Sequence, residues 1–98
     1  MEKIDKYSLV EQAKAGNKKA FEAIVSEYEG QIFSFCFRFF GNEEDAMDAT
    51  QEVFIKVYRA IKNFEERSSL KTWMYRIASN TCITLANMKK REKAGVLS

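Results

Sequence analysis

Proline is absent from this chain of 98 residues, and only four glycines interrupt it. Apolar residues recur at spacings of three and four, which is the period of an α-helix. Three of the glycines, Gly16, Gly41 and Gly95, fall where this periodicity stops. Long helices need few special backbone conformations, and glycine commonly ends them. The sequence therefore predicts an all-α fold, a compact bundle of about four helices in one domain spanning residues 1–98.

The net charge of +2 conceals two halves of opposite sign. Residues 1–52 hold 6 basic and 11 acidic side chains, whereas residues 53–98 hold 10 basic and 3 acidic ones. We expect a chain polarised in this way to face two different partners. On charge alone, attraction between the two halves within the fold is the open alternative.

The residue types present argue against several classes of function. The chain has no histidine, so imidazole ligands and histidine-based acid–base catalysis are absent. Cys36 and Cys82 lie in helical apolar patterns, which favours two buried thiols, with a disulfide as the alternative, and the lack of CxxC spacing argues against a zinc site. No apolar run reaches the roughly 20 residues of a membrane span, and the first residues are not a signal peptide. We expect a cytoplasmic protein that is not an enzyme, with no metal, no cofactor and no membrane contact of its own.

The first expected helix is short, with Ser8 as its N-cap and Gly16 as its stop. The second runs from its N-cap, Asn17, to Phe40. Its apolar residues cover more than one face, so it must be covered on more than one side. They are interpreted as core and not as a cofactor site: Phe21, Ile24, Val25, Tyr28, Ile32, Phe33, Phe35, Cys36, Phe37, Phe39 and Phe40.

A third helix is expected to open at Asn42, with carboxylates in its first turns, where the helix dipole favours them. Ile55 is an aliphatic residue on the polar outer face, which favours a docking surface. A solvated face with one stray isoleucine is the alternative, and Asp45 with Asp48 would need further ligands to hold a metal. The inner stripe is Ala46, Ala49, Thr50, Val53, Phe54, Val57 and Ile61, and the outer face is Asp48, Gln51, Glu52, Ile55 and Arg59.

Residues 63–69 form the expected loop, and Ser69 is the N-cap of the last helix. Phe64 either fills the core or offers its ring to a flat ligand, and Trp73 poses the same choice. The basic tail, residues 89–93, is expected to prolong the helix and to fray at Ala94 and Gly95. The inner stripe of this helix is Leu70, Trp73, Met74, Ile77, Thr81, Leu85 and Met88.

The loop and the last helix combine cations with aromatic rings, as single-stranded nucleic-acid sites do. Ser68 and Ser69 offer hydroxyl groups, and the amide of Asn80 can read a base edge. A loop that leads into a capped helix start forms a cup for an extruded base, so Phe64, Lys71 and Asn80 are expected to share one cleft. The candidate cations are Lys56, Arg59, Arg67, Lys71 and Arg76, and the candidate rings are Phe64, Trp73 and Tyr75.

Several motifs follow one another along the chain. They are Asp45-Ala-x-Asp48-x-x-Gln51-Glu52-Val53-Phe54, Val57-Tyr58-Arg59, Asn63-Phe64 and Ser69-x-x-Thr72-Trp73-x-Tyr75-Arg76-Ile77-Ala78-x-Asn80. Upstream stand Ala13-x-x-Gly16-x-x-x-Ala20-Phe21 and Arg38-x-x-Gly41-Asn42. Together they resemble region 2 of bacterial sigma factors, of the extracytoplasmic-function (ECF) group. The resemblance covers nearly the whole chain.

The resemblance implies a domain of a transcription initiation factor. The third helix would dock on the coiled-coil clamp helices of the RNA polymerase β′ subunit through Asp48, Gln51 and Glu52, to which we add Ile55 on physical grounds. The loop and last helix would recognise and melt the promoter −10 element and trap a flipped base of the non-template strand. The residues for this role are Phe64, Ser68, Ser69, Lys71, Thr72, Trp73, Tyr75, Arg76 and Asn80.

The resemblance also implies two features outside this domain. One is an anti-sigma factor that covers one of the two surfaces. The other is a second helical domain, which reads the −35 element and is absent from this chain. The alternative from another class is a purely protein-binding helical module that makes no contact with DNA.

Overall fold

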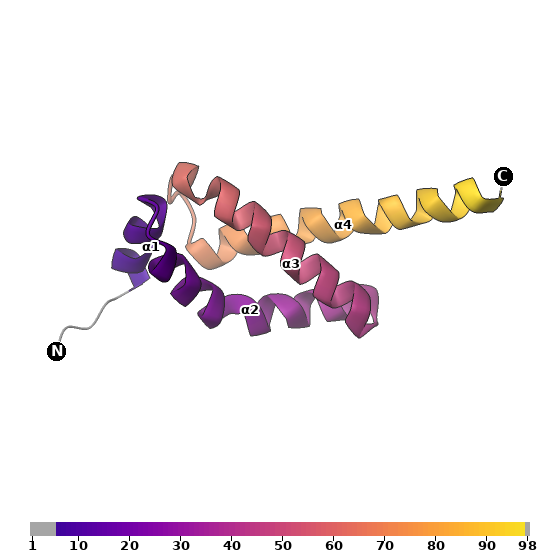
Figure 1. The fold of residues 1–98 in the computed structure, drawn as a ribbon, viewed down its shortest axis with the longest axis horizontal. Coiled ribbons are helices and arrows are strands. Elements are labelled where there is room, and N and C mark those ends of the chain that lie inside the picture. The colour runs from indigo at the N-terminus through magenta and orange to yellow at the C-terminus, as the bar shows by residue number, and fades with distance from the viewer. Residues whose placement is uncertain (1–5, 98) are drawn as a thin grey trace.

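A computed structural model describes residues 6–97 of the chain, with side chains placed for residues 9–95. The described chain is helical, with three long helices and one short one (Figure 1). The predicted all-α bundle of about four helices is confirmed. Its elements are α1 (Lys6–Lys14), α2 (Lys18–Phe40), α3 (Glu43–Ala60), the 3-10 turn η1 (Ile61–Asn63) and α4 (Leu70–Leu97).

The predicted N-caps begin the three long helices. Asn17, Asn42 and Ser69 each accept a hydrogen bond from the backbone N–H three residues further on, at 3.0, 2.8 and 3.1 Å. Each cap satisfies one of the backbone donors that a helix start leaves without an intrahelical partner. The starts of α2, α3 and α4 are therefore fixed by their local sequence.

Gly16 and Gly41 end the first two helices in the left-handed region. Their φ angles are 99° and 79°, which a side chain would make costly. The N–H of Gly41 donates to the carbonyl of Phe37 at 2.7 Å, and that of Gly16 donates to Ala13 at 3.0 Å. Both predicted stops are confirmed, and they let α1, α2 and α3 fold back on one another through short turns.

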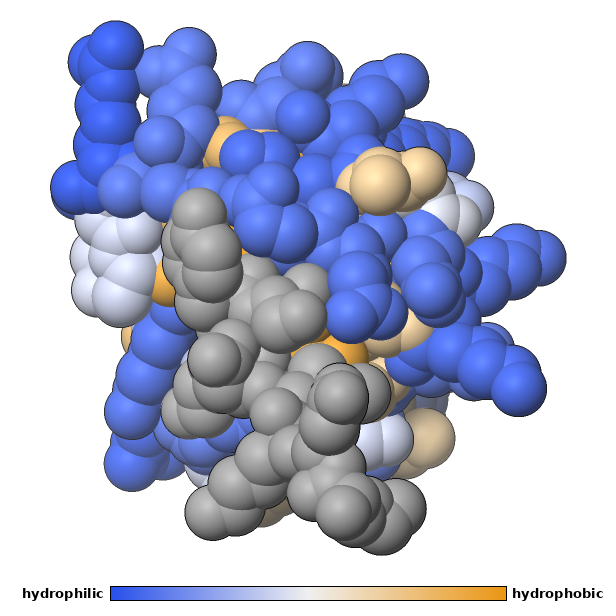
Figure 2. Space-filling model, turned by 90° about the vertical axis from the view of Figure 1, so that its left-hand side faces the viewer, coloured by the Kyte–Doolittle hydropathy of each residue, from blue (hydrophilic) through white to orange (hydrophobic). Residues whose placement is uncertain are grey.

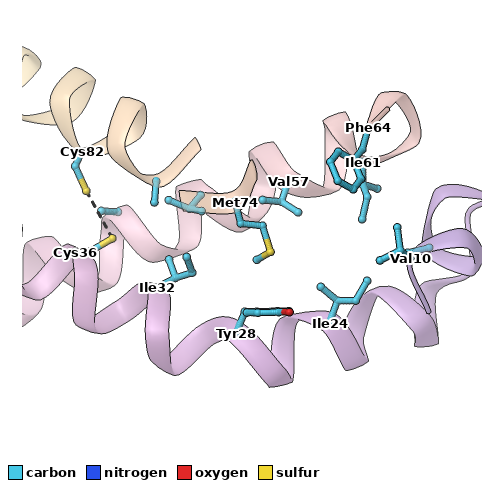
Figure 3. Close-up of a cluster of buried hydrophobic side chains, with 14 of the residues drawn as sticks. Val10, Ile24, Tyr28, Ile32, Cys36, Val57, Ile61, Phe64, Met74 and Cys82 are labelled. Carbon is cyan, nitrogen blue, oxygen red and sulfur yellow. Dashed lines mark hydrogen bonds between the residues drawn. The ribbon is translucent and has the colours of Figure 1, made fainter. Parts of the chain in front are cut away.

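The hydrophobic core lies along α2, which packs against α1, α3 and α4 (Figures 1 and 3). Ile32 of α2, Val57 of α3 and Met74 of α4 are fully buried and meet in this core. Three different helices thus cover most of the apolar residues expected to make α2 a core helix. Among residues 6–97, no helix combines the length and hydrophobicity that crossing a membrane requires.

Cys36 of α2 and Cys82 of α4 are buried free thiols, as predicted (Figure 3). The Cys82 thiol donates to the Cys36 sulfur across 3.6 Å. Burial, together with this hydrogen bond, raises the pKa of the Cys82 thiol from 9.0 to about 12. The Cys82 thiol therefore stays protonated at neutral pH, and the two cysteines pack as small apolar side chains.

The two ends of the chain differ from expectation. α1 begins at Lys6, two residues before Ser8, whose side chain lies outside the described part. α4 passes through Gly95 and ends at Leu97, so the predicted fraying at residues 94–95 is wrong. Its second half projects beyond the other helices (Figure 1), and the molecule is 60 Å long but only 24 Å wide.

Three predicted core residues are exposed. Met88 of α4 is 48% exposed, and Phe37 and Phe39, near the end of α2, are 42% and 45% exposed. Met88 lies on the projecting half of α4, and Phe37 and Phe39 lie on a side of α2 that is not buried by the other described helices. The helical period identifies an apolar face, whereas burial also needs a neighbour opposite that face.

One ion pair ties the projecting helix to the body. Lys89 Nζ lies 2.8 Å from Asp45 Oδ1, at the start of α3. The hydrogen bond from Lys89, followed by one from Asn42, lowers the pKa of the Asp45 carboxyl, and the same pair raises the pKa of Lys89. Asp45 is thereby engaged in holding α4.

Replacing Lys89 with methionine is expected to raise the Asp45 pKa towards its ordinary value of 3.8, because the Lys89 hydrogen bond is the largest cause of the lowering. A lowered carboxyl pKa stabilises the fold above the unfolded-state value, and this contribution is lost as the pH falls through the folded-state pKa. NMR titration of the Asp45 carboxyl carbon measures the shift. Lys90→Met removes the same charge one residue away, and an equal shift in both variants would contradict the ion pair.

Met74→Ala is expected to lower the free energy of unfolding by about 2–5 kcal/mol, because it leaves a cavity in the core. Met88→Ala is the matched control and should change stability by no more than about 0.5 kcal/mol. The two methionines are 0% and 48% exposed. Urea unfolding followed by circular dichroism measures both, and equal losses would contradict the described burial.

Candidate nucleic-acid and protein interfaces

The loop between α3 and α4 is anchored by an aromatic stack. Phe64 is 5% exposed, and its ring lies 4.7 Å from that of Trp73 between centroids, with a 30° interplanar angle. The sequence left open whether Phe64 fills the core or offers its ring to a ligand, and in the structure it fills the core. Its ring cannot stack on a base without leaving that position, which corrects its assignment as an exposed stacking ring.

The loop carries two carboxylates, and both are paired with cations. Glu66 Oε2 lies 3.4 Å from Lys14 Nζ of α1, and Glu65 lies 3.0 Å from Arg67. Glu66 has a φ of 59°, in the left-handed region that costs a non-glycine residue about 1–2 kcal/mol. The loop is thus held in one strained conformation, with its negative charges compensated.

A cleft of about 410 Å³ opens beside this loop. Its wall includes two serines, Ser68 and Ser69, and one cationic residue, Lys71. Ser69 Oγ caps α4 and also donates to Thr72 Oγ1 at 3.0 Å, and Ser68 Oγ donates to the carbonyl of Ser69 at 3.4 Å, so both hydroxyls have local partners. The lining residues are Val10, Tyr28, Phe64, Glu66, Ser68, Ser69, Leu70 and Lys71.

Asn80 does not line this cleft. It lies nine residues beyond Lys71 on the same helix, which is about 13 Å along the axis and half a turn around it. The expected cleft common to Phe64, Lys71 and Asn80 is therefore wrong for Asn80. Instead Thr72, Arg76 and Asn80 stand four residues apart on α4, all exposed, and form a second polar strip, the outer ridge of α4.

The remaining candidates for nucleic-acid binding are dispersed. Trp73 and Tyr75 are half-buried, Tyr75 by an edge-to-face contact with Phe35 at 5.5 Å. Arg67 is an exposed loop residue. Lys56 is half-buried on α3, and Arg59 lines the groove between α2 and α3 with Gln51 and Ile55. The structure therefore does not bring Arg59 together with the loop residues.

The expected outer face of α3 lies beside an apolar groove. Asp48, Gln51 and Ile55 are exposed and Glu52 is half-buried. Gln51 and Ile55 form one edge of a groove of about 770 Å³ between α2 and α3, with a smaller cleft adjoining it. The groove is lined by Phe21, Val25, Glu29, Thr50, Gln51, Phe54, Ile55, Tyr58 and Arg59.

Sequence reasoning missed two residues of this surface. Met47 and Tyr58 are 49% and 53% exposed, and they line the smaller cleft and the groove. The sequence spacing could have identified both residues, because residues 47, 51, 55 and 58 are spaced by four, four and three and therefore lie on one side of a helix. Phe21 packs edge-to-face on Tyr58 at 5.0 Å, so the two helices hold this apolar surface in place.

The described surface combines polar clefts, exposed cations and an apolar groove. Among residues 9–95, no three His, Cys, Asp or Glu side chains come together as a metal site. The end of the molecule formed by α1 and the loop shows mostly hydrophilic surface outside its grey area, with small apolar areas (Figure 2). Polar clefts, exposed cations and an apolar groove are features of recognition surfaces.

Comparison with known protein families identifies the family of this chain. The sequence model of the family described as Sigma-70 region 2 matches residues 24–92. The chain belongs to the sigma-70 region 2 family. It is of the ECF type, as the motifs in its sequence predicted. Region 2 of a sigma factor is a transcription-factor domain and not an enzyme.

Relatives of this region 2 domain come from different bacteria. It is 45% identical over 73 residues to RNA polymerase sigma-H factor of Pseudomonas aeruginosa, covering 74% of this chain and 38% of that protein. It is 40% identical over 81 residues to ECF RNA polymerase sigma factor SigW of Bacillus subtilis, covering 83% and 43%. It is 42% identical over 73 residues to ECF RNA polymerase sigma-E factor of Escherichia coli, covering 74% and 38%. The matches span 38% to 43% of the length of these three relatives.

A solved structure resembles the whole region 2 domain. It is the NMR structure of an engineered region 2 of sigmaE in complex with GTAAAA. The two share 35% sequence identity and superpose with a TM-score of 0.86, over 94% of this chain and 96% of the other. The four-helix arrangement is therefore that of a sigma region 2 domain.

Proposed function

We propose that this domain binds RNA polymerase through α3 and recognises and melts the promoter −10 element through the loop and α4. It would act in the cytoplasm, as part of a sigma factor whose further domain reads the −35 element. The polymerase-binding residues are Asp48, Gln51, Glu52 and Ile55. The DNA-binding residues are Lys56, Arg59, Phe64, Arg67, Ser68, Ser69, Lys71, Thr72, Trp73, Tyr75, Arg76 and Asn80.

The observation that carries the proposal is the similarity to a region 2 domain in complex with GTAAAA, over nearly the full length of both chains. The loop cleft supports it from this chain's own residues. Serine hydroxyls, backbone amides at a helix start and Lys71 suit the edge of a base and its phosphate. Pairing of Glu65 and Glu66 with cations removes the repulsion that two free carboxylates would exert on a polyanion.

From their positions we infer different tasks for the candidate residues. Phe64 lines the cleft that would receive a flipped base, and its stack on Trp73 holds the ring in place. Ser68 and Ser69 hydrogen-bond that base, while Lys71 and Arg67 meet phosphates. The outer ridge of α4 follows the strand beyond the cleft, with Arg76 on the backbone and Asn80 on a neighbouring base edge. Lys71 in the cleft and Asn80 on the outer ridge are about 13 Å apart along α4, so the two sites together span more than one nucleotide.

On the other side, the apolar groove between α2 and α3 fits a helix of a protein partner. Gln51 and Ile55 lie at its edge, and Met47 and Tyr58 extend the apolar contact. Exposed Asp48 and Glu29 favour a partner with basic side chains beside its apolar ridge. The clamp helices of the polymerase β′ subunit are the proposed partner, and an anti-sigma factor that covers either surface would block transcription.

Fluorescence anisotropy with labelled single strands tests the DNA-binding part. GTAAAA and strands altered at single positions are titrated at two salt concentrations. We expect tighter binding of the preferred strand at both, with overall affinity falling as salt rises. Binding that is uniform among strands and erased by salt, or no binding, would instead support a purely protein-binding module.

Asn80→Ala is expected to reduce the preference among bases by about 1–3 kcal/mol at one position, because a base-edge contact is lost. It should leave polymerase binding unchanged, since Asn80 lies on the outer ridge of α4. Anisotropy with strands and a pull-down with core polymerase measure the two activities. The double variant Gln51→Ala, Glu52→Ala should show the reverse pattern. If both variants weaken both activities equally, the two-surface arrangement is wrong.

A further inference from the structure

The ion pair between Lys14 and Glu66 joins α1 to the recognition loop. Lys14 is the last residue of α1, and its Nζ lies 3.4 Å from Glu66 Oε2 and 5.9 Å from the centroid of the Phe64 ring. The two paired side chains are 21% and 29% exposed, whereas those of Arg67 and Glu65 are 87% and 68% exposed. Solvent and salt screen a partly buried pair less, so it constrains the loop more firmly.

Glu66 is the residue through which such a constraint would reach the cleft. It lines the cleft, and its φ of 59° is unfavourable for a residue with a side chain. A conformation of this kind persists only where its surroundings hold it. Lys14 borders a different cleft, between the α1–α2 turn and η1, so it influences the recognition cleft through Glu66 and Phe64.

We propose that Lys14 is a positioning residue for base selection. Its ion pair with Glu66 fixes the loop in the conformation that shapes the cleft, and it neutralises a carboxylate that would otherwise face the phosphates of the strand. α1 thereby belongs to the recognition site without reading a base itself. This inference rests on the proposed binding of single-stranded DNA by the loop.

The test compares Lys14→Met with Lys19→Met in the anisotropy assay, using GTAAAA and its singly altered strands. Both variants remove one positive charge, and Lys19 is an exposed residue of α2. Lys19→Met should weaken all strands alike. Lys14→Met should lower the ratio of affinities between the best and the poorest strand by about threefold to tenfold. Equal behaviour of the two variants, with the ratio retained, would overturn the proposal.

Two further variants separate the ion pair from a loss of folding, which circular dichroism monitors. Glu66→Gly accepts the φ of 59° without strain while removing the carboxylate, so it should keep the fold and lose the discrimination. The exchange Lys14→Glu with Glu66→Lys should restore discrimination relative to Lys14→Met. Retained discrimination in Glu66→Gly, or no restoration by the exchange, counts against the ion pair. A wild-type protein without any preference among strands would instead overturn the proposed function itself.

Discussion

Burial of Phe64 fixes the connection on which the candidate DNA site depends. Its ring leaves the loop, enters the core and stacks on Trp73, while the Ser69 cap fixes the other end of the loop. The few residues between these anchors must face water, because a short loop cannot satisfy its backbone groups internally. The polar wall of the cleft is therefore a consequence of how the core is closed.

Much of the fold is encoded locally and could be predicted from the sequence. Asn17, Asn42 and Ser69 each find their bonding partner three residues away, and Gly16 and Gly41 act within the last turn of their helices. Such signals do not depend on how helices pack, which is why the helix boundaries around them were correct. The apolar stripe of α3 was also correct, because α2 and α4 both cover it.

The parts that could not be predicted depend on which segments meet in space. Met88 and Phe39 have the pattern of core residues, but their exposure follows from the different lengths and positions of the helices. Lys14 and Glu66 lie 52 residues apart, and no local pattern links them. The family resemblance assigned Phe64, Lys71 and Asn80 to one function. Only the geometry shows that Phe64 and Lys71 line the cleft, whereas Asn80 lies on the outer ridge of α4.

The arrangement also indicates where base selectivity arises in the proposed function. Extruding a base costs a few kcal/mol, and stacking on protein rings returns about 1–3 kcal/mol per base where a free ring face is offered. Phe64 and Trp73 already stack on each other, and therefore these two rings offer little additional stacking energy to a base. Selectivity must then come from the fixed hydroxyls of Ser68 and Ser69 and from the outer ridge of α4. A loop that is held in place before the strand binds loses less conformational entropy on binding. A small polar cleft is then sufficient for selective binding of a base.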